Sequence, residues 1–218
     1  MVRRIQFKTK SEWLRARKGK IGGSDAATVL GLNPYKTNQE LYEEMIGVRT
    51  AADISDKPYV IYGTKAEEHI RALFALDHPE YQVDYYGDNM LVNGKCPFAH
   101  ASLDGELIEL ETGRKGIFEC KTTELFSSMS KEKWDGNNIP DNYYIQVLHY
   151  LMVTEYEFVE LRAQIKSKWN NQIRLTTKDY HIERSEVEED IQILLDAEKK
   201  FINKVNNRSQ PSLILPNI

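Results

Sequence analysis

Residues 116–122 read Gly116-Ile117-Phe118-Glu119-Cys120-Lys121-Thr122, and Leu103-Asp104-Gly105 stands a short distance before them. The apolar flanks predict a β-strand, in which successive side chains face opposite sides. Glu119 and Lys121 then share one face, and Phe118 and Cys120 share the other. An acid and a base buried side by side are costly unless each is paired or hydrated. We therefore expect Glu119 and Lys121 to have a function.

The acids of these two segments have the chemistry of a divalent metal site. A hard cation such as Mg²⁺ takes oxygen ligands and keeps several waters, so two or three carboxylates suffice. Asp104 and Glu119 would supply them from neighbouring strands if residues 99–104 pair with residues 117–121. Lys121 would orient or deprotonate an attacking water and offset charge at a scissile phosphate.

Two further residues are candidate ligands. The thiol of Cys120 points away from Glu119, but the Cys120 backbone carbonyl lies beside it. Glu67, on a predicted helix, would reach the site directly or through a water, whereas Glu68 points about 100° away around that helix. The residues alone also allow a solvated Glu-Lys pair without a function, because an exposed Glu-x-Lys pair contributes under ~1 kcal/mol to stability and is common in strands.

Bulk properties restrict the class of protein. The chain has 218 residues, 41% of them hydrophobic, which is enough for one substantial core. No apolar run approaches the ~18 residues of a membrane span, and residues 1–6 lack the apolar core of a signal peptide. We therefore expect a cytoplasmic protein with Cys96 and Cys120 reduced. The net charge of −4 argues against general coating of nucleic acid, although not against a local basic groove.

Capping motifs and glycines predict the helices, and β-branched and aromatic runs predict the strands. Ser24 is expected to cap the second helix, and Ser185 to open the last with a capping box. The expected helices are about residues 10–18, 26–30, 37–46, 63–76, 140–152 and 185–205. The expected strands are an antiparallel meander over 81–122, then 158–165 and 173–182, joined by a turn around Asn170-Asn171. This order predicts an α/β fold with a mixed central sheet flanked by helices.

The chain is expected to form a single domain with three parts. Residues 1–60 would be an N-terminal helical part, residues 61–165 a catalytic core, and residues 166–218 a C-terminal strand and helix. The sequence shows no internal repeat, low-complexity tract or linker that would divide it further.

Several motifs in order along the chain resemble the PD-(D/E)xK nuclease superfamily, and within it the phage lambda exonuclease / YqaJ viral recombinase family. They are the N-terminal stretch 13–27, the helix motif Gly63 to Glu67, Ser102-Leu103-Asp104-Gly105, Glu119-Cys120-Lys121, and the helix 144–150 that carries Gln146. The resemblance covers most of the chain and implies a restriction-endonuclease-like core.

The resemblance also implies roles for individual residues. In the family, metal ions sit on the residues that match Asp104 and Glu119, with the carbonyl at Cys120 and help from Glu67, and Lys121 would be the catalytic lysine. The family's positions for a terminal 5′ phosphate are matched by Arg17, Ser24, Ser102 and Gln146. A guanidinium, two hydroxyls and an amide can all donate to phosphate oxygens.

The function that follows from the resemblance is a Mg²⁺-dependent exonuclease that digests double-stranded DNA from 5′ ends and leaves 3′ single-stranded tails. Mn²⁺ is expected to substitute, with two ions per site. The resemblance further implies a homo-oligomeric ring, with a trimer favoured, a single-strand annealing protein as partner, and a phage or prophage origin in a bacterial cell. Candidate DNA contacts are Lys18, Lys20, Lys36 and Arg71.

Two departures and two rivals accompany this interpretation. Leu103 stands where many superfamily members have Pro, and the segment after Asp104 carries Glu106, Glu109 and Glu111, interpreted as a solvated turn extension. The enzymatic rival is a restriction-type or structure-selective PD-(D/E)xK endonuclease. The other rival is a catalytically silent protein that binds DNA ends.

Overall fold

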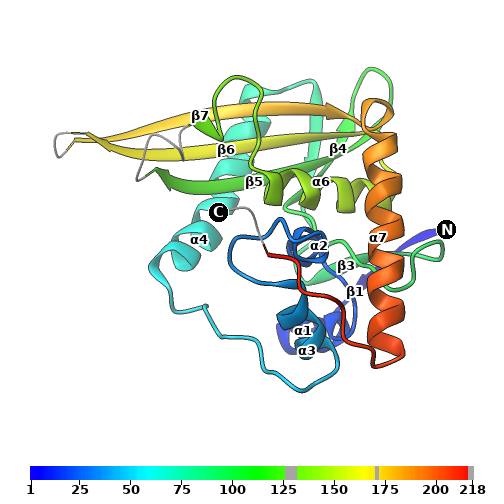
Figure 1. The fold of residues 1–218 in the computed structure, drawn as a ribbon. Helices are drawn as coiled ribbons and strands as arrows, with labels where there is room; N and C mark the ends of the chain where they lie inside the picture. The colour runs from blue at the N-terminus through cyan, green and yellow to red at the C-terminus, as the bar shows by residue number, and fades with distance from the viewer. Residues whose placement is uncertain (126–131, 170–171, 216–218) are drawn as a thin grey trace.

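The computed structural model describes residues 1–125, 132–169 and 172–215, and its centre is a five-stranded mixed sheet (Figure 1). The strands lie in the order β2 (Tyr81–Asp84), β4 (Gly105–Glu109), β5 (Lys115–Leu125), β6 (Phe158–Trp169) and β7 (Gln172–Glu183). β5 and β6 run parallel, and the other neighbouring pairs run antiparallel. The predicted mixed sheet flanked by helices is therefore confirmed.

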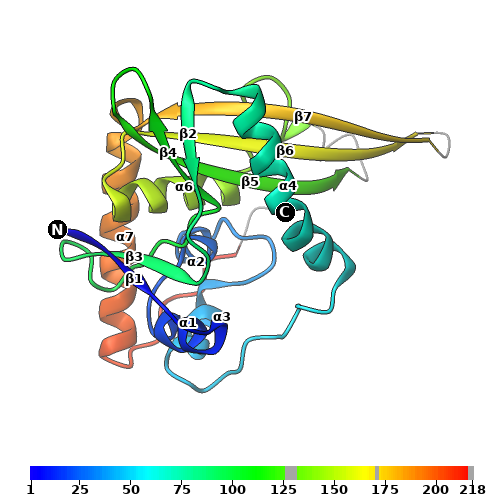
Figure 2. The same cartoon turned by 180° about the vertical axis from the view of Figure 1, so that it is seen from behind.

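A helix covers each face of this sheet (Figure 2). They are α4 (Pro58–Asp77) on one face and α6 (Asp141–Thr154) on the other, with α7 (Glu188–Asn206) packed crosswise against α6 (Figure 1). Phe118 and Cys120 pack with Phe74 of α4, whereas Ile117 belongs to the cluster that holds Leu148 of α6. The predicted alternation along β5 is therefore confirmed, and Glu119 and Lys121 face α6.

The N-terminal elements lie below α6 in Figure 1. They are β1 (Val2–Gln6), α1 (Lys10–Arg17), α2 (Gly23–Val29) and α3 (Asn38–Met45). β1 pairs with β3 (Asn89–Asn93) in a separate two-stranded sheet. The meander predicted over 81–122 is thus wrong at β3, because the N-terminal strand, which was not expected, takes β3 as its partner.

The helix starts test the capping motifs. Thr9 and Thr37 cap α1 and α3, and Thr37 forms a full capping box with Glu40. Ser24 does not cap α2, because Gly22 is the N-cap and Ser24 is the second residue of the helix. Ser185 does not open α7 either, since it lies in a short 3₁₀ turn that precedes Glu188.

Other boundaries shift by a few residues. α4 begins at Pro58, earlier than the predicted residue 63, because proline is well tolerated at the first position of a helix. β6 and β7 are longer than predicted, and the turn expected at Asn170-Asn171 lies outside the described residues. In the described ranges no helix is both long and apolar enough to cross a membrane.

The acidic segment after Asp104 is mostly strand, which corrects the expectation of a solvated extension. Glu106 lies in β4, half-buried, and accepts hydrogen bonds from Arg4 and Tyr156. Glu109 ends β4 and binds Thr112 and Arg114. Glu111 alone is exposed in the turn. None of these contacts involves Asp104.

Candidate nuclease site

The candidate site lies where β5 loses one of its two neighbouring strands. The pairing of β4 with β5 ends at Gly105 opposite Phe118, whereas β5 continues along β6 to Leu125. Beyond Phe118, no strand in the described residues pairs with the other edge of β5. Asp104 directly precedes β4, and its Oδ2 accepts a 2.9 Å hydrogen bond from the backbone N–H of Cys120. The expected pairing of residues 99–104 with β5 is therefore wrong, but Asp104 still reaches β5 with its side chain.

Glu119 is the buried centre of the site. Its carboxylate is 1% exposed, and its Oε1 accepts hydrogen bonds from Lys121 Nζ and, at 2.9 Å, from Gln146 Nε2. Its Oε2 is buried with no hydrogen-bond partner among the described residues. Lys121 also lies 5.2 Å from the ring centroid of Tyr143 on α6. The acid-x-lysine pair thus forms a buried ion pair with one carboxylate oxygen unused.

Glu67 approaches the same site from the opposite face, on α4. Arg71, one turn along α4, donates to Glu67 Oε1 at 3.3 Å and to the backbone carbonyl of Asp104 at 2.6 Å. The Arg71 guanidinium also stacks over Tyr85 at 3.8 Å from the ring centroid. Arg71, a candidate DNA contact in the sequence, is therefore held by the protein and ties Glu67 to Asp104. Glu68 is exposed, as expected of the neighbour that points away.

The carboxyl groups repel one another. Burial, followed by the charge of Asp104, raises the pKa of Glu119 to about 8. Burial and Asp104 likewise raise the pKa of Glu67 to about 7, against the opposing charge of Arg71. Burial tends to lower the pKa of Lys121, but Glu119 and Asp104 outweigh it, and the pKa rises. Lys121 is therefore a cation at neutral pH, in a site with an excess of acidic groups.

Cys120 contributes through its backbone. Its side chain packs on the α4 face, and burial, with the charge of Asp104 next, raises the pKa of the thiol. In a β-strand the N–H and C=O of one residue project toward the same edge. Because the Cys120 N–H points to Asp104, the Cys120 carbonyl projects to that open edge of β5 as well.

The side chains around Glu119 offer oxygen donors to a divalent cation. Among the described residues, no group of three or more His, Cys, Asp or Glu side chains is already arranged as a metal-binding cluster. The chemistry nevertheless fits: Glu119 has an unpartnered buried oxygen, and the pKa values of two carboxyl groups are raised by a third. Oxygen donors with excess negative charge are what Mg²⁺ prefers.

Two of the four residues matched to a terminal phosphate, Arg17 and Ser24, lie near Gly22. Arg17 ends α1, with its guanidinium 4.3 Å from the Trp13 ring centroid and Nη2 3.7 Å from where a Cβ on Gly22 would lie. Ser24 follows two residues after Gly22, and its side chain is exposed. These two residues therefore lie around one turn.

Gln146 connects that turn to Glu119. Besides Glu119, its Nε2 donates to the hydroxyl of Tyr150 at 2.8 Å. The Tyr150 ring lies so close to Gly23 that a Cβ there would be 2.4 Å from Cε1. Tyr150 was not among the predicted site residues, although its position four residues after Gln146 places both side chains on one face of the helix.

Ser102 and the lysines are less directly placed. Ser102 Oγ donates to the carbonyl of Asn89 at 3.2 Å. Lys36 pairs with Glu44 at 2.8 Å, and Lys20 donates to the carbonyl of Pro97. Lys18 is exposed. Of the four basic candidates for DNA contact, Lys36 and Arg71 already bind carboxylates of this chain.

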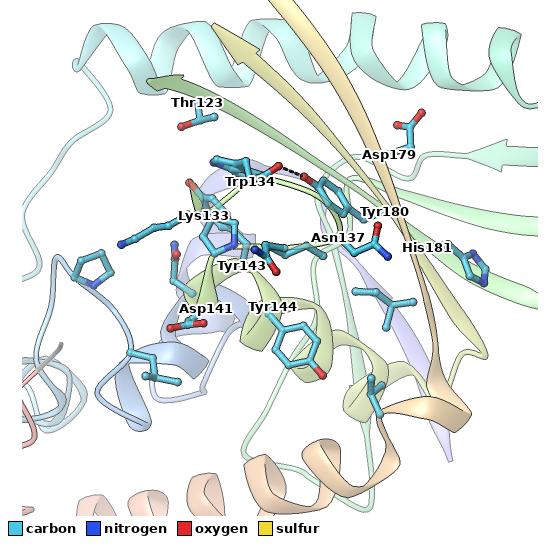
Figure 3. Close-up of a pocket in the computed structure, with 18 of the residues that line it drawn as sticks. Thr123, Lys133, Trp134, Asn137, Asp141, Tyr143, Tyr144, Asp179, Tyr180 and His181 are labelled. Carbon is cyan, nitrogen blue, oxygen red and sulfur yellow. Dashed lines mark hydrogen bonds between the residues drawn. The ribbon is translucent and has the colours of Figure 1, made fainter. Parts of the chain in front are cut away.

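A groove of about 960 Å³ lies beside the site, between β7, α6 and residues 133–142 (Figure 3). Trp134, Tyr143 and Tyr180 form part of its wall, and the Tyr180 hydroxyl donates to the Trp134 carbonyl at 3.1 Å. Its described lining has one lysine, Lys133, against four acids, Glu124, Asp141, Asp179 and Glu186. An acidic groove that holds none of the candidate catalytic residues does not suit a phosphate backbone, so the β5 edge stays the candidate site.

Comparison with solved structures agrees with this architecture. The alkaline exonuclease from Laribacter hongkongensis superposes with a TM-score of 0.61 and 17% identity, over 91% of this chain and 96% of that chain. A phage related exonuclease from Haemophilus somnus 129PT superposes with a TM-score of 0.53 and 14% identity, over 87% of this chain and 96% of that chain. These likenesses establish the PD-(D/E)xK fold.

Comparison of sequences identifies the family. The uncharacterized protein YqaJ of Bacillus subtilis (strain 168) is 32% identical over 164 residues, which are 69% of this chain. The chain spans 44% of the length of that relative. Residues 12–157 match the YqaJ-like viral recombinase domain and include Arg17, Asp104 and the Glu119–Lys121 segment. The chain therefore belongs to the family of YqaJ-like viral recombinase domains.

Proposed function

We propose that this protein is a Mg²⁺-dependent exonuclease that degrades double-stranded DNA from its 5′ ends and leaves 3′ single-stranded tails for recombination by annealing. The observation that carries the proposal is the buried Glu119, which pairs with Lys121 and keeps one oxygen without a partner. Membership of the viral recombinase family and the structural likeness to two exonucleases support it.

The cation would be held by Asp104, Glu119 and the Cys120 carbonyl, with Glu67 as a ligand directly or through a water. A bound Mg²⁺, or Mn²⁺ in its place, would activate a water and offset charge at the scissile phosphate. We propose two ions per site. Three carboxyl groups, those of Glu67, Asp104 and Glu119, would share the charge of these ions.

Lys121 would act as a fixed cation beside the phosphate. Because its pKa is raised, it is a better electrostatic partner for the developing charge than a base. Gln146 would hold Glu119 in place through its 2.9 Å hydrogen bond. The attack on the phosphodiester would be in line, with the 3′ oxygen as the leaving group.

Recognition of the DNA end would come from the turn near Gly22. Arg17 can donate a guanidinium fork to a terminal 5′ phosphate, and Ser24 and Ser102 can donate hydroxyls. Gln146 is shared between this turn and the hydrolytic site through Tyr150. We further propose a ring-shaped homo-oligomer, with a trimer favoured, a single-strand annealing partner, and a cytoplasmic location in a bacterial cell.

The decisive experiment is a time course on three substrates: linear duplex with 5′-phosphate ends, the same duplex with 5′-hydroxyl ends, and closed circular duplex. With Mg²⁺ the phosphorylated linear duplex should be degraded fastest and the circle left intact, and a chelator should stop degradation. Equal cutting of the circle would favour the endonuclease, and binding without hydrolysis of any substrate would favour the silent end-binding protein.

A further inference from the structure

β6 and β7 extend together as a ribbon toward one side of the molecule, at the left in Figure 1. β5 pairs with β6 as far as Leu125 opposite Ser167, and the β6–β7 pairing continues to Trp169 opposite Gln172. We call residues 164–169 and 172–178 the basic arm. α7 lies on the opposite side of the molecule in the same view.

The basic arm concentrates positive charge in an acidic chain. It contains Lys166, Lys168, Arg174 and Lys178 and no Asp or Glu, although the whole chain has a net charge of −4. Lys166 forms an ion pair with Glu124, with 3.3 Å between Nζ and Oε2. Lys178 donates a hydrogen bond to the backbone carbonyl of Trp134. Lys168 and Arg174 are exposed, and within the described ranges no acidic side chain lies within ion-pair distance of either.

The charges occupy both faces of the ribbon. Lys168 lies opposite Ile173, and Arg174 opposite Ser167, so the two cations project to opposite faces. Arg174 shares the face of Lys121, and Lys168 shares the face covered further along by α4. A partner that wraps around or crosses the ribbon would therefore meet positive charge from either side.

Lysines on an edge strand also keep other chains from pairing with it. That explanation accounts poorly for Lys166, which lies on β6 between its two neighbouring strands β5 and β7. It also leaves Ile173 and Leu175 exposed on the edge strand itself, at 61% and 54%. The charge pattern fits a polyanion better than it fits protection of the edge.

We propose that the basic arm binds the phosphate backbone of duplex DNA, ahead of the end that is degraded. The proposal rests on the proposed function, since it takes Lys121 as the position of cleavage. Lys121 lies opposite Ala163 on β6, and Lys168 follows five residues later. At ~3.3 Å per strand residue this is about 17 Å, or about five nucleotides of a duplex strand at 3.4 Å each.

The test compares Lys168→Ala/Arg174→Ala with the matched control Lys200→Ala/Lys204→Ala, which removes two exposed charges from α7. Binding of a 5′-phosphorylated duplex of about 20 base pairs is measured in chelator at several salt concentrations. Loss of two phosphate contacts should lower the slope of log K against log salt by about 1.8 and weaken binding at least about tenfold at ~0.1 M salt. The control should match the wild type.

Three results separate the possibilities. Unchanged affinity and slope in the arm variant, with the wild type still degrading linear duplex, would overturn the arm and leave the proposed function standing. A wild type that binds duplex but degrades none would overturn the function instead. A change in sedimentation mass of the arm variant would mean that the arm joins copies of this chain, which also overturns the proposal.

Discussion

The backbone N–H of Cys120 donates to Oδ2 of Asp104 at 2.9 Å, at the point where β4 stops pairing with β5. The carboxylate thus takes over a hydrogen bond that a further strand residue would have accepted. Burial raises the pKa values of Glu67 and Glu119, and the charge of the same Asp104 side chain raises them further. Asp104 is therefore both an end to the local sheet pairing and a source of charge for the site.

These two roles can be separated by substitution. Asp104→Asn keeps an oxygen that can accept the Cys120 N–H but removes the charge. Cleavage should fall at least about a hundredfold, while the unfolding free energy changes little. Asp104→Ala should lose cleavage and, in addition, about 1 kcal/mol of stability, because the hydrogen bond is gone. Urea unfolding and a duplex degradation assay check both variants; equal stability losses would contradict the structural role.

Lys121→Ala should abolish detectable cleavage and leave the fold intact. Removal of the cation leaves Glu119 buried, but with its pKa already raised this carboxyl can take up a proton instead. Circular dichroism should show a folded protein, and binding of phosphorylated ends in chelator should persist. Hydrolysis at the wild-type rate would remove Lys121 from the mechanism.

Arg17→Met should reduce the preference for 5′-phosphorylated ends. Methionine keeps an unbranched apolar side chain against Trp13 but cannot donate to phosphate. The ratio of degradation rates on 5′-phosphate and 5′-hydroxyl duplex should fall by about tenfold or more, as expected for a lost charge-assisted hydrogen bond of at least ~1.5 kcal/mol. Lys18→Met is the matched control and should keep the ratio; an unaltered ratio in Arg17→Met would place phosphate recognition elsewhere.

Gly116→Ala should destabilise the protein by about 1–3 kcal/mol, because overpacking displaces a buried ring. A Cβ on Gly116 would lie 2.3 Å from the ring of Phe158, directly opposite on β6. Gly94→Ala is the control: its Cβ would meet nothing closer than 3.8 Å, and it should change stability by less than about 0.5 kcal/mol. Similar unfolding midpoints for the two variants would contradict the crowding.

The buried pair His149 and Glu198 should make stability depend on pH. Burial lowers the pKa of His149, but the charge and the 2.7 Å hydrogen bond of Glu198 outweigh it, so the pKa is raised above 6.5. A group with a raised folded pKa stabilises fully below its unfolded pKa, near 6.5, and loses that contribution as pH rises through the folded value. Unfolding free energy should therefore decline above about pH 6.5.

Glu198→Gln supplies the comparison for this pair. It keeps the shape of the side chain but removes the charge that favours imidazolium. Its unfolding free energy should vary less with pH than that of the wild type between about pH 6 and 9. Identical pH profiles for the two proteins would show that His149 is neutral when folded.

Local signals predicted the structure where the physical cause was local. Thr37 and Glu40 form their capping box from residues three positions apart, and the alternation along β5 follows from strand geometry alone. Ser24 failed as a cap because Gly22 took the position and also lies against the His100 ring, a tertiary contact that no local pattern contains. β3 was misplaced for the same reason, since its partner β1 lies more than eighty residues away.

The candidate site shows a similar division. Glu119 and Lys121 could be paired from their spacing. Asp104 and Glu67 were named as candidate ligands from the residues, and Gln146 was named through the family resemblance. Their contacts were not predictable in detail: Arg71 was interpreted as a DNA contact but ties Glu67 to the Asp104 carbonyl. Tyr150 was missed because an aromatic residue on an apolar helix is ordinarily core.

The position of Asp104 just before the first residue of β4 affects how this site can change in evolution. Asp104 is fixed to β5 by register, since Gly105 next to it is the last residue of the ladder. The loop between β4 and β5 can gain or lose residues without moving either acid, whereas a single insertion between Asp104 and Gly105 would displace the carboxylate from Cys120. Related sites are therefore better recognised by the strand position at which the acid stands than by the number of residues between the two acids.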